Sequence, residues 1–373
     1  MKKTLLALAV VSVASSAFAN TNLYTYSNGN TSANLGVFAE ARYFLQDRSV
    51  KVNGDSANKE DNKYNQGRLR FGLYGSMTDS NNLTYSFYTR FNTRFDYHSQ
   101  KVAGIKSGEH TRDGVEFNRG YVQLSHPTYG SFLFGKYVTV ADDKFGNDME
   151  ADHYAFEAND ERGFTAWTAP TSFDTVVTYL APEFYGVKGG LSYGETKASQ
   201  YQYTKQYALQ ASYNLAGNHV VFNYANTRNR ADLQTTETQN SYDLAFYNDG
   251  LVQDFVLGAA FTYEHTSTNT EAKDKAWSLA AKARYTGFQY AQPFLNLAYV
   301  KEKVDAYDKS STTKTRYYNL AVGAASDVYT YETAKVTVFA EYFYSRAKET
   351  VRDVQGSTKT KNKGFNVGAK LTF

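Results

Sequence analysis

The chain has 373 residues, and its 40 Lys and Arg nearly balance its 37 Asp and Glu, for a formal net charge of +3. This near-neutral balance excludes a general polyanion binder, and we expect no nucleic-acid partner. Cysteine is absent, which excludes disulfide scaffolds, Cys-based zinc sites and thiol nucleophiles, whereas Tyr (33) and Phe (25) are frequent and Pro (4) is rare.

The first segment, residues 1–19, has the layout of a secretory signal. Lys2 and Lys3 precede an apolar stretch at 5–14, and the small-residue sequence Ala-Phe-Ala ends the segment. This order predicts an exported protein with a cleaved signal peptide and a mature chain of residues 20–373. The alternative, a transmembrane anchor, is disfavoured because the apolar stretch is shorter than the roughly 20 residues that span a bilayer.

The segment at 83–95 shows an alternation of apolar and polar residues that recurs along the chain. Its odd positions include Leu83, Tyr85 and Phe87, whereas its even positions include Arg90 and Arg94. Such alternation predicts a β-strand with one apolar face and one polar, cationic face. The same alternation recurs at 33–45, 68–74 and 365–373.

Alternating segments of this kind recur about sixteen times along the chain. They lie near 33–45, 64–77, 82–96, 116–126, 130–138, 173–181, 185–194, 204–215, 218–228, 240–248, 252–266, 276–286, 289–303, 315–327, 334–348 and 363–373. Most are longer than the roughly 5–6 residues of an ordinary sandwich strand, and long enough for a tilted membrane strand. A soluble antiparallel sandwich is therefore the weaker alternative.

The connectors between these segments alternate in length. Short turns such as 78–81, 127–130 and 216–218 are followed by long polar stretches near 46–63, 97–115, 139–172, 195–203, 229–239, 267–275, 304–314 and 349–362. Short turns at one end and long loops at the other are typical of an outer-membrane barrel. The sequence therefore predicts an all-β, transmembrane antiparallel β-barrel of about 16 strands, with short periplasmic turns and long extracellular loops.

A barrel of about sixteen strands leaves a water-filled lumen, so the predicted function is a passive channel. The longest connector, 139–172, carries the acidic residues Asp142, Asp143, Asp148, Glu150 and Asp152, among others. Strand alternation places basic side chains on the inner wall: Arg42, Arg68, Arg70, Arg90, Arg94 and Arg119. Folded inward, the loop would narrow the pore and set a transverse field across it. The alternative is that the loop faces outside water with its charges solvated.

Over essentially the whole mature chain, the sequence resembles the trimeric general-diffusion porins of Gram-negative outer membranes. The resemblance is carried by the Leu-Gly-x-Phe-x-x-x-Arg strand at 35–42, Arg70 within Leu-Arg-Phe-Gly, and the stretches at 118–124, 129–136 and 177–186. It implies an inward-folded third loop at 139–172 whose carboxylates face a ladder of arginines. Arg70 and Arg119 match the ladder best, and Lys136 matches a basic lumen position beside the loop. The loop lacks the Pro-Glu-Phe-Gly-Gly stretch of the best-known members.

The resemblance also implies a location and partners. It places the protein in the outer membrane as a homotrimer, in contact with lipid and lipopolysaccharide, passing small hydrophilic solutes and ions. The last alternating strand, which ends in Phe373, resembles the C-terminal signal read by the barrel assembly machinery. An exposed strand edge with a terminal aromatic residue can pair by β-augmentation.

Other functions fit the sequence less well. None of the six histidines pairs obviously with a serine and an acid, so we expect no enzyme. Asp148, Glu150 and Asp152 could hold Ca²⁺, but the glycine and distal Glu of an EF-hand loop are missing, so we expect no metal and no cofactor. A sugar-type, solute-specific channel would need a continuous lumen track of aromatic rings. The inward candidates are few: Phe38, Phe44, Tyr74, Tyr88 and Tyr121. A surface adhesin or receptor barrel is the remaining alternative.

Overall fold

Long two-faced strands make up nearly all of the described chain. The computed structural model describes residues 21–29, 31–53, 59–102, 105–112, 114–142, 164–199, 202–215, 217–231, 235–248, 252–269, 273–288, 290–305, 311–331, 334–352 and 357–372. Within these ranges no helix is both long and apolar enough to cross a bilayer.

The described residues form eighteen strands and one short 3-10 helix. Their bounds are β1 Thr21–Asn28, β2 Thr31–Val52, β3 Lys59–Thr78, β4 Thr84–Val102, β5 Ile105–Arg112, β6 Glu116–His126, β7 Gly130–Val138, η1 Val140–Asp142, β8 Ser172–Leu180, β9 Val187–Lys197, β10 Tyr203–Leu215, β11 Asn218–Arg230, β12 Thr236–Asn248, β13 Phe255–Thr268, β14 Lys273–Tyr285, β15 Gln292–Asp305, β16 Thr312–Tyr331, β17 Ala334–Val351 and β18 Thr358–Thr372.

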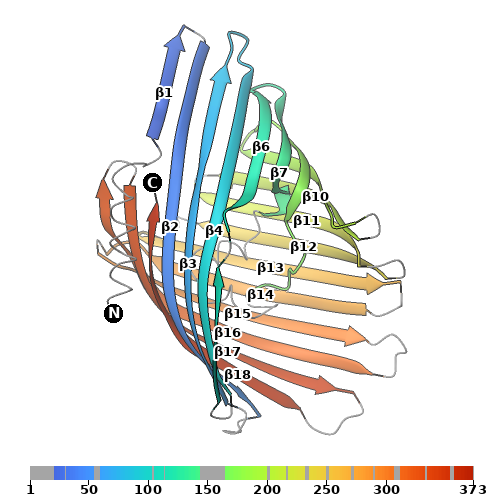
Figure 1. Ribbon diagram of the computed structural model, residues 1–373. Helices are drawn as coiled ribbons and strands as arrows, with labels where there is room; N and C mark the ends of the chain where they lie inside the picture. Colours follow the sequence, from blue (N-terminus) through green and yellow to red (C-terminus); the bar gives the residue numbers. More distant parts are fainter. Residues whose placement is uncertain are drawn as a thin grey trace.

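Antiparallel pairing closes these strands into a barrel (Figure 1). The ring closes where β18 pairs with β2, from Thr360 opposite Val52 to Thr372 opposite Glu40. Two of the eighteen strands, β1 and β5, add no position to the ring. β5 and β6 share one edge of β4, at its loop end and its turn end respectively. β1 pairs with β2 beyond the end of β18, and it stands at the upper left of Figure 1. The barrel is therefore sixteen-stranded.

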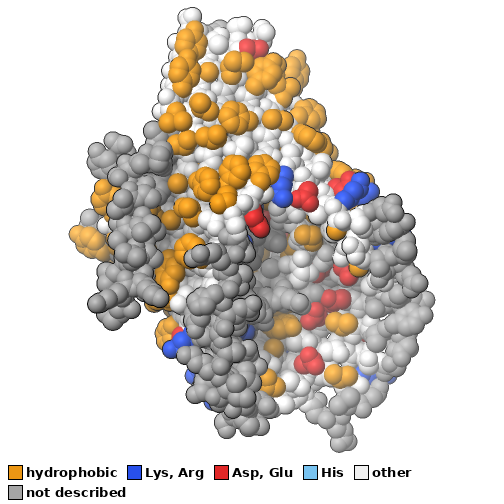
Figure 2. All heavy atoms as spheres, viewed as in Figure 1, with side chains coloured by type: hydrophobic (Ala, Val, Ile, Leu, Met, Phe, Trp, Pro, Cys, Tyr) orange, Lys and Arg blue, Asp and Glu red, His pale blue; other side chains and the backbone are white. Residues whose placement is uncertain are grey.

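The two faces of each strand meet different surroundings. Leu69 and Phe71 of β3 are exposed on the outer face, whereas Arg68 next to Leu69 is only 6% exposed on the inner face. Apolar side chains spread over the outer surface of the upper strands, while acidic side chains gather in the hollow (Figure 2). In a bilayer this arrangement puts apolar groups against lipid and polar groups in the lumen, while neighbouring strands of the closed sheet pair their backbone groups.

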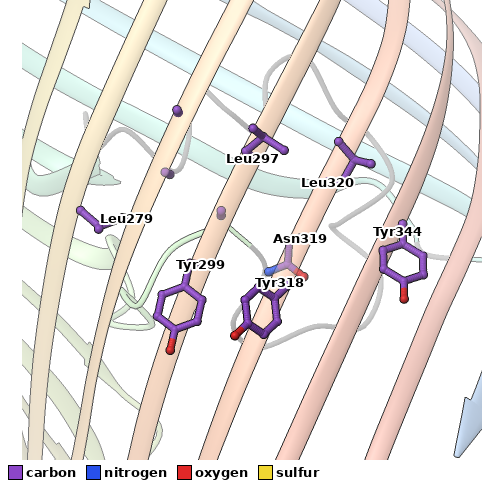
Figure 3. Close-up of a pocket in the computed structure, with 10 residues that line it drawn as sticks. Leu279, Leu297, Tyr299, Tyr318, Asn319, Leu320 and Tyr344 are labelled. Atoms are coloured by element: carbon purple, nitrogen blue, oxygen red, sulfur yellow. The ribbon is translucent and has the colours of Figure 1, made fainter.

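Tyrosines form a row on the outer face toward the loop end of the barrel. In Figure 3, Tyr299, Tyr318 and Tyr344 lie at one level across β15, β16 and β17, and Leu297 and Leu320 lie at the next level. The sheet register brings the rings together in pairs: Tyr193 with Tyr207, Tyr224 with Tyr242, Tyr242 with Tyr263, Tyr263 with Trp277, and Tyr299 with Tyr318. Amphipathic rings of this kind sit at the headgroup level of a membrane.

The predicted sixteen-strand barrel is confirmed, but two of the expected loops are largely strand. The stretch at 46–63 contains the end of β2 and the start of β3, and the stretch at 97–115 contains the end of β4 and all of β5. β1 was not predicted at all. These segments carry few apolar residues on either face. The period-2 signal therefore stops while the hydrogen-bonded ladder continues.

Candidate functional site

A cluster of basic side chains covers the inner wall formed by β2, β3, β4 and β6. The register pairs Arg42 with Arg68 and Arg90 with Arg119. Arg42 and Arg68 are buried, although both face the lumen side of their strands. Arg94 lies opposite Arg68 on β4 and is exposed. The sequence thus predicted the shared face of these arginines.

Glu40 on β2 is the shared anion of this cluster. Its Oε1 lies 3.3 Å from Nη2 of Arg68 and 3.4 Å from Nη1 of Arg70, and its Oε2 lies 3.4 Å from Nζ of Lys370. Neither Glu40 nor Lys370 was predicted to belong to the site. Both lie on the polar faces of the two strands that close the barrel, so the closure brings together residues from opposite ends of the chain.

Arg90 is held by a bulge in the neighbouring strand. Its Nε donates a hydrogen bond to Oδ1 of Asn118 at 2.9 Å, and its Nη2 donates to the same oxygen. The bulge arises because Arg90 pairs with Arg119 while the next residue, Phe91, pairs with Phe117, leaving Asn118 unpaired in the ladder. A bulge of this kind redirects a side chain. Here it fixes the guanidinium of Arg90 beside that of Arg119.

Lys136 is the exception among the predicted basic residues, because the structure places it on the outer face. In β7, Leu133 points inward and is 8% exposed, whereas Phe134 points outward. Lys136 continues the outer row, and its Nζ lies 2.8 Å from Oδ1 of Asp174 on β8. The expected lumen position for Lys136 is therefore wrong. The consecutive apolar residues at 132–134 do not alternate with polar ones, so the sequence does not show which side chains of this strand point inward.

Both ends of the third long loop lie inside the barrel. At its start, the Thr139 hydroxyl donates to Oε1 of Gln206 at 2.6 Å. At its end, the Thr168 backbone N–H and hydroxyl donate to the two oxygens of Glu264 on β13, at 2.8 and 2.6 Å. Nearby, the Ala166 N–H donates to the hydroxyls of Thr262 (2.9 Å) and Ser278 (3.0 Å). The inward-folded third loop is therefore confirmed in its described parts.

Small residues on the inner wall make room for this loop. Trp167 packs in a cluster with Ala141, Ala169, Ala208 and Ala225, and it is only 2% exposed. Phe164 packs against a second group of inward residues: Ala245, Ala260, Ala280, Ala298, Ala321 and Phe343. This alanine face on β10–β16 lies across the lumen from the arginines. Alanines repeated on the inner faces of successive strands are a sequence signal for an occupied lumen, and the predicted site did not include them.

Asp142 connects the loop to the basic wall. It ends η1, and its Oδ2 lies 4.0 Å from Nη2 of Arg119. The Thr171 hydroxyl donates a hydrogen bond to its other carboxylate oxygen. The remaining acidic candidates, Asp143, Asp148, Glu150 and Asp152, and the C-terminal Phe373 lie outside the described residues. Within those residues no group of three or more His, Asp or Glu side chains could hold a metal ion.

Comparisons with known proteins agree with this geometry. Residues 4–371 match the family described as Gram-negative porin. The fold is similar to the anion-selective porin from Comamonas acidovorans (14% identity, 91% of this chain and 100% of that chain, TM-score 0.62). It is also similar to the trimer form of OmpT from Vibrio cholerae (11%, 91% and 99%, TM-score 0.59) and to Salmonella typhi OmpF in complex with daunomycin (14%, 92% and 100%, TM-score 0.56). No curated protein matches the chain.

Proposed function

The chain belongs to the Gram-negative porin family, and we propose that Arg42, Arg68, Arg70, Arg90 and Arg119 form one side of the selective region of its channel. Like other members, it is an outer-membrane barrel with a water-filled lumen for passive diffusion of small hydrophilic solutes and ions. For the acidic side of the selective region we propose Asp142 and, from the sequence alone, Asp143, Asp148, Glu150 and Asp152 of the constriction loop 139–172.

The contact between Asp142 and Arg119 is the observation that carries this proposal. Residues 164–171 are hydrogen-bonded to β13 and β14 on the far wall, whereas Asp142 reaches the arginine wall. The two ends of the loop lie side by side, since the Thr139 N–H donates to the carbonyl oxygen of Thr171 at 2.8 Å. The described loop residues contact the inner wall from β10 to β14, which reduces the open cross-section of the pore opposite the arginines.

Opposed charges across this space act on each solute that passes. Basic side chains on one wall and carboxylates on the loop produce a transverse field, which is strong because the barrel wall has a low dielectric constant. A dipolar, hydrated solute aligns with the field, whereas an apolar solute loses hydration without compensation. The field thus favours small polar solutes as a class.

The outer surface supports a homotrimer. The paired tyrosine row covers β9–β16, where rings at the headgroup level suit contact with lipid and lipopolysaccharide. The outer face of β2–β7 instead carries mainly apolar residues such as Leu35, Phe71, Phe87, Val122 and Phe134, with Tyr85 among them. A surface that faces another copy of the chain needs no such amphipathic rings. A high-mass band in SDS gels that disappears on heating would support the trimer, and a monomer at all temperatures would contradict it.

The remaining parts of the proposal concern export and chemistry. Residues 1–19 would be removed as a signal peptide, leaving a barrel of residues 20–373, and the C-terminal strand ending in Phe373 would be recognised by the assembly machinery. Membership of a channel family supports a protein without enzymatic activity or cofactors.

Electrical recording tests the channel directly. Protein purified in detergent and added to a planar bilayer should give large, ohmic conductance steps with weak ion selectivity. A preparation that inserts as folded barrels but never conducts would overturn the channel. Block by a neutral sugar at micromolar concentration would indicate a sugar-specific channel instead.

A further inference from the structure

A continuous row of aromatic rings crosses the inner wall of the barrel. The ring of Phe38 on β2 stacks on that of Tyr88 on β4, with centroids 5.2 Å apart and planes at 9°. Tyr88 stacks in turn on Tyr121 of β6 at 5.5 Å, and Tyr121 meets Tyr137 of β7 edge to face at 4.7 Å. We call these four residues the aromatic row. The inward rings predicted from the sequence are few, but the fold makes them contiguous in space.

Gly72 makes the row continuous. Phe38 and Tyr88 belong to strands that are separated by β3, and Gly72 is the residue of β3 opposite Phe38. A Cβ atom at Gly72 would lie 2.7 Å from Cε1 of Phe38 and 1.8 Å from the backbone oxygen of Thr89. Only glycine leaves the gap through which Phe38 reaches across β3 to Tyr88.

The aromatic row runs directly beside the arginines. Tyr88 pairs with Tyr121 and, two residues along the same strands and faces, Arg90 pairs with Arg119. The guanidinium carbon of Arg119 lies 5.4 Å from the ring centroid of Tyr137. Each of these two guanidinium groups therefore has an aromatic ring as its neighbour on the turn side of the barrel.

A concavity joins the two kinds of side chain. Its volume is about 310 Å³, and its lining includes Phe38, Glu40, Arg70, Tyr74, Tyr88 and Arg90. This volume is at the lower end of the roughly 300–1,000 Å³ range of small-molecule sites. A small solute in this space would touch aromatic rings on one side and guanidinium groups on the other.

The charge around the concavity favours an anion. The charged residues in its lining are Arg70, Arg90 and Glu40, so the cations outnumber the carboxylate. Arg42, Arg68 and Lys370 lie next to them on the same face of the closed sheet. Glu40 is already within 3.4 Å of three of these cations. The side chain of Arg70 remains 23% exposed, so it can still meet a solute.

We propose that this concavity is a low-affinity site for small aromatic carboxylates, an inference that rests on the channel function and narrows its preferred solutes. The carboxylate would accept hydrogen bonds from Arg70 and Arg90, and the ring would pack against Phe38 and Tyr88. Arginine suits this role because its planar fork matches a carboxylate. Aromatic pairs contribute beyond simple apolar contact, which distinguishes an aromatic ring from a saturated one.

Block of single-channel current by matched anions tests this site. Benzoate is compared with cyclohexanecarboxylate, which has a saturated ring, with acetate, which has none, and with glucuronate, a sugar acid. We expect benzoate to reduce the current at about 3- to 10-fold lower concentration than each of the other anions. Tyr88→Leu should abolish this preference, while Tyr344→Leu, the same change on the outer face of β17, should retain it. Tyr121→Leu is a second variant in the row in case Tyr88→Leu does not fold.

Each outcome decides the proposal. Equal block by benzoate, cyclohexanecarboxylate and acetate would overturn the aromatic site while the open-channel conductance still showed a working pore. Stronger block by glucuronate than by benzoate would show that the site prefers sugar acids to aromatic carboxylates, and would overturn the proposal. A preference for benzoate that survived in both row variants would place the binding elsewhere in the lumen.

Discussion

The carboxylate of Asp142 lies 4.0 Å from the guanidinium of Arg119, although one residue begins the third long loop and the other belongs to the barrel wall. The pair is partly exposed, with about a quarter of each side chain accessible. Its contribution to stability is therefore small, on the order of 1 kcal/mol or less. In the selective region proposed above, a permeating ion would pass both charges at close range.

Asp142→Asn should shift the permeability ratio toward anions. At about 4 Å a unit charge contributes roughly 1 kcal/mol to the energy of an ion even in water, so we expect a two- to fivefold change. Reversal potentials in a salt gradient measure the ratio. Asp174→Asn is the matched control, since Asp174 pairs with Lys136 on the outer face and should leave selectivity unchanged. An unchanged ratio for Asp142→Asn would mean that this carboxylate does not face the ion path, and Asp143 and Asp148 would then be tested in the same way.

Glu40→Gln should also raise anion preference, for a different reason. The substitution removes the anion that Arg68, Arg70 and Lys370 share, so three cations lose their counter-charge at once. We expect the folded barrel to lose about 1–3 kcal/mol as well, because these side chains are largely buried and would repel one another. Heat-modified mobility in gels reports the stability, and reversal potentials report the selectivity.

Glu195→Gln provides the control for Glu40→Gln. Glu195 lies within 3.1 Å of Lys197 and 3.4 Å of Lys205, so it too neutralises more than one lysine, but on the outer face. Its loss should leave ion selectivity as it is. If Glu40→Gln changed stability without changing selectivity, the arginine cluster would be structural and the ion path would lie elsewhere.

Glu264→Gln should loosen the inward-folded loop. The carboxylate accepts hydrogen bonds from the Thr168 N–H, the Thr168 hydroxyl and the Ser241 hydroxyl at 2.6–2.9 Å. An amide replaces one acceptor oxygen by a donor, so at least one buried partner is left unsatisfied at a cost of about 1–3 kcal/mol. We expect more frequent current fluctuations between levels in single-channel recordings. Glu341→Gln on β17, where Asn366 donates to the carboxylate, is the control on the same inner surface. Equally quiet currents in both variants would show that Glu264 does not hold the loop.

The barrel and most of the basic wall could be predicted from sequence because both follow from local alternation. Successive side chains of a strand point to opposite faces. Because Leu69 and Phe71 are predicted to face lipid, Arg68 and Arg70 are predicted to face the lumen. The contact between Glu40 and Lys370 could not be predicted in this way, because it forms only where the barrel closes and pairs strands from opposite ends of the chain. Lys136 was misplaced because the apolar run before it carries no alternation.

The aromatic row and the loop contacts depend on register between neighbouring strands. Strand alternation alone places Phe38 and Tyr88 on the inner face, but it does not show that Gly72 leaves room for their rings to stack. In the same way, inward alanines such as Ala225 and Ala260 carry no polarity that would mark their face as lumen. Their meaning becomes clear only when Phe164 and Trp167 are seen packed against them.

A substitution on the outer face of β14 tests which face of the sheet contacts lipid. Leu279 is 54% exposed on this face, and its cross-strand partner is Tyr299 of the tyrosine row. Leu279→Arg should destabilise the folded barrel by about 2–4 kcal/mol if this position lies near the bilayer midplane, and by less if it lies near the interface. Unfolding by guanidinium chloride in lipid vesicles measures the loss. Leu279→Phe keeps an apolar group at the same position and should change stability little. If both variants were as stable as the parent protein, β14 would not face lipid at Leu279, and the assignment of the two faces of the sheet would have to be reversed.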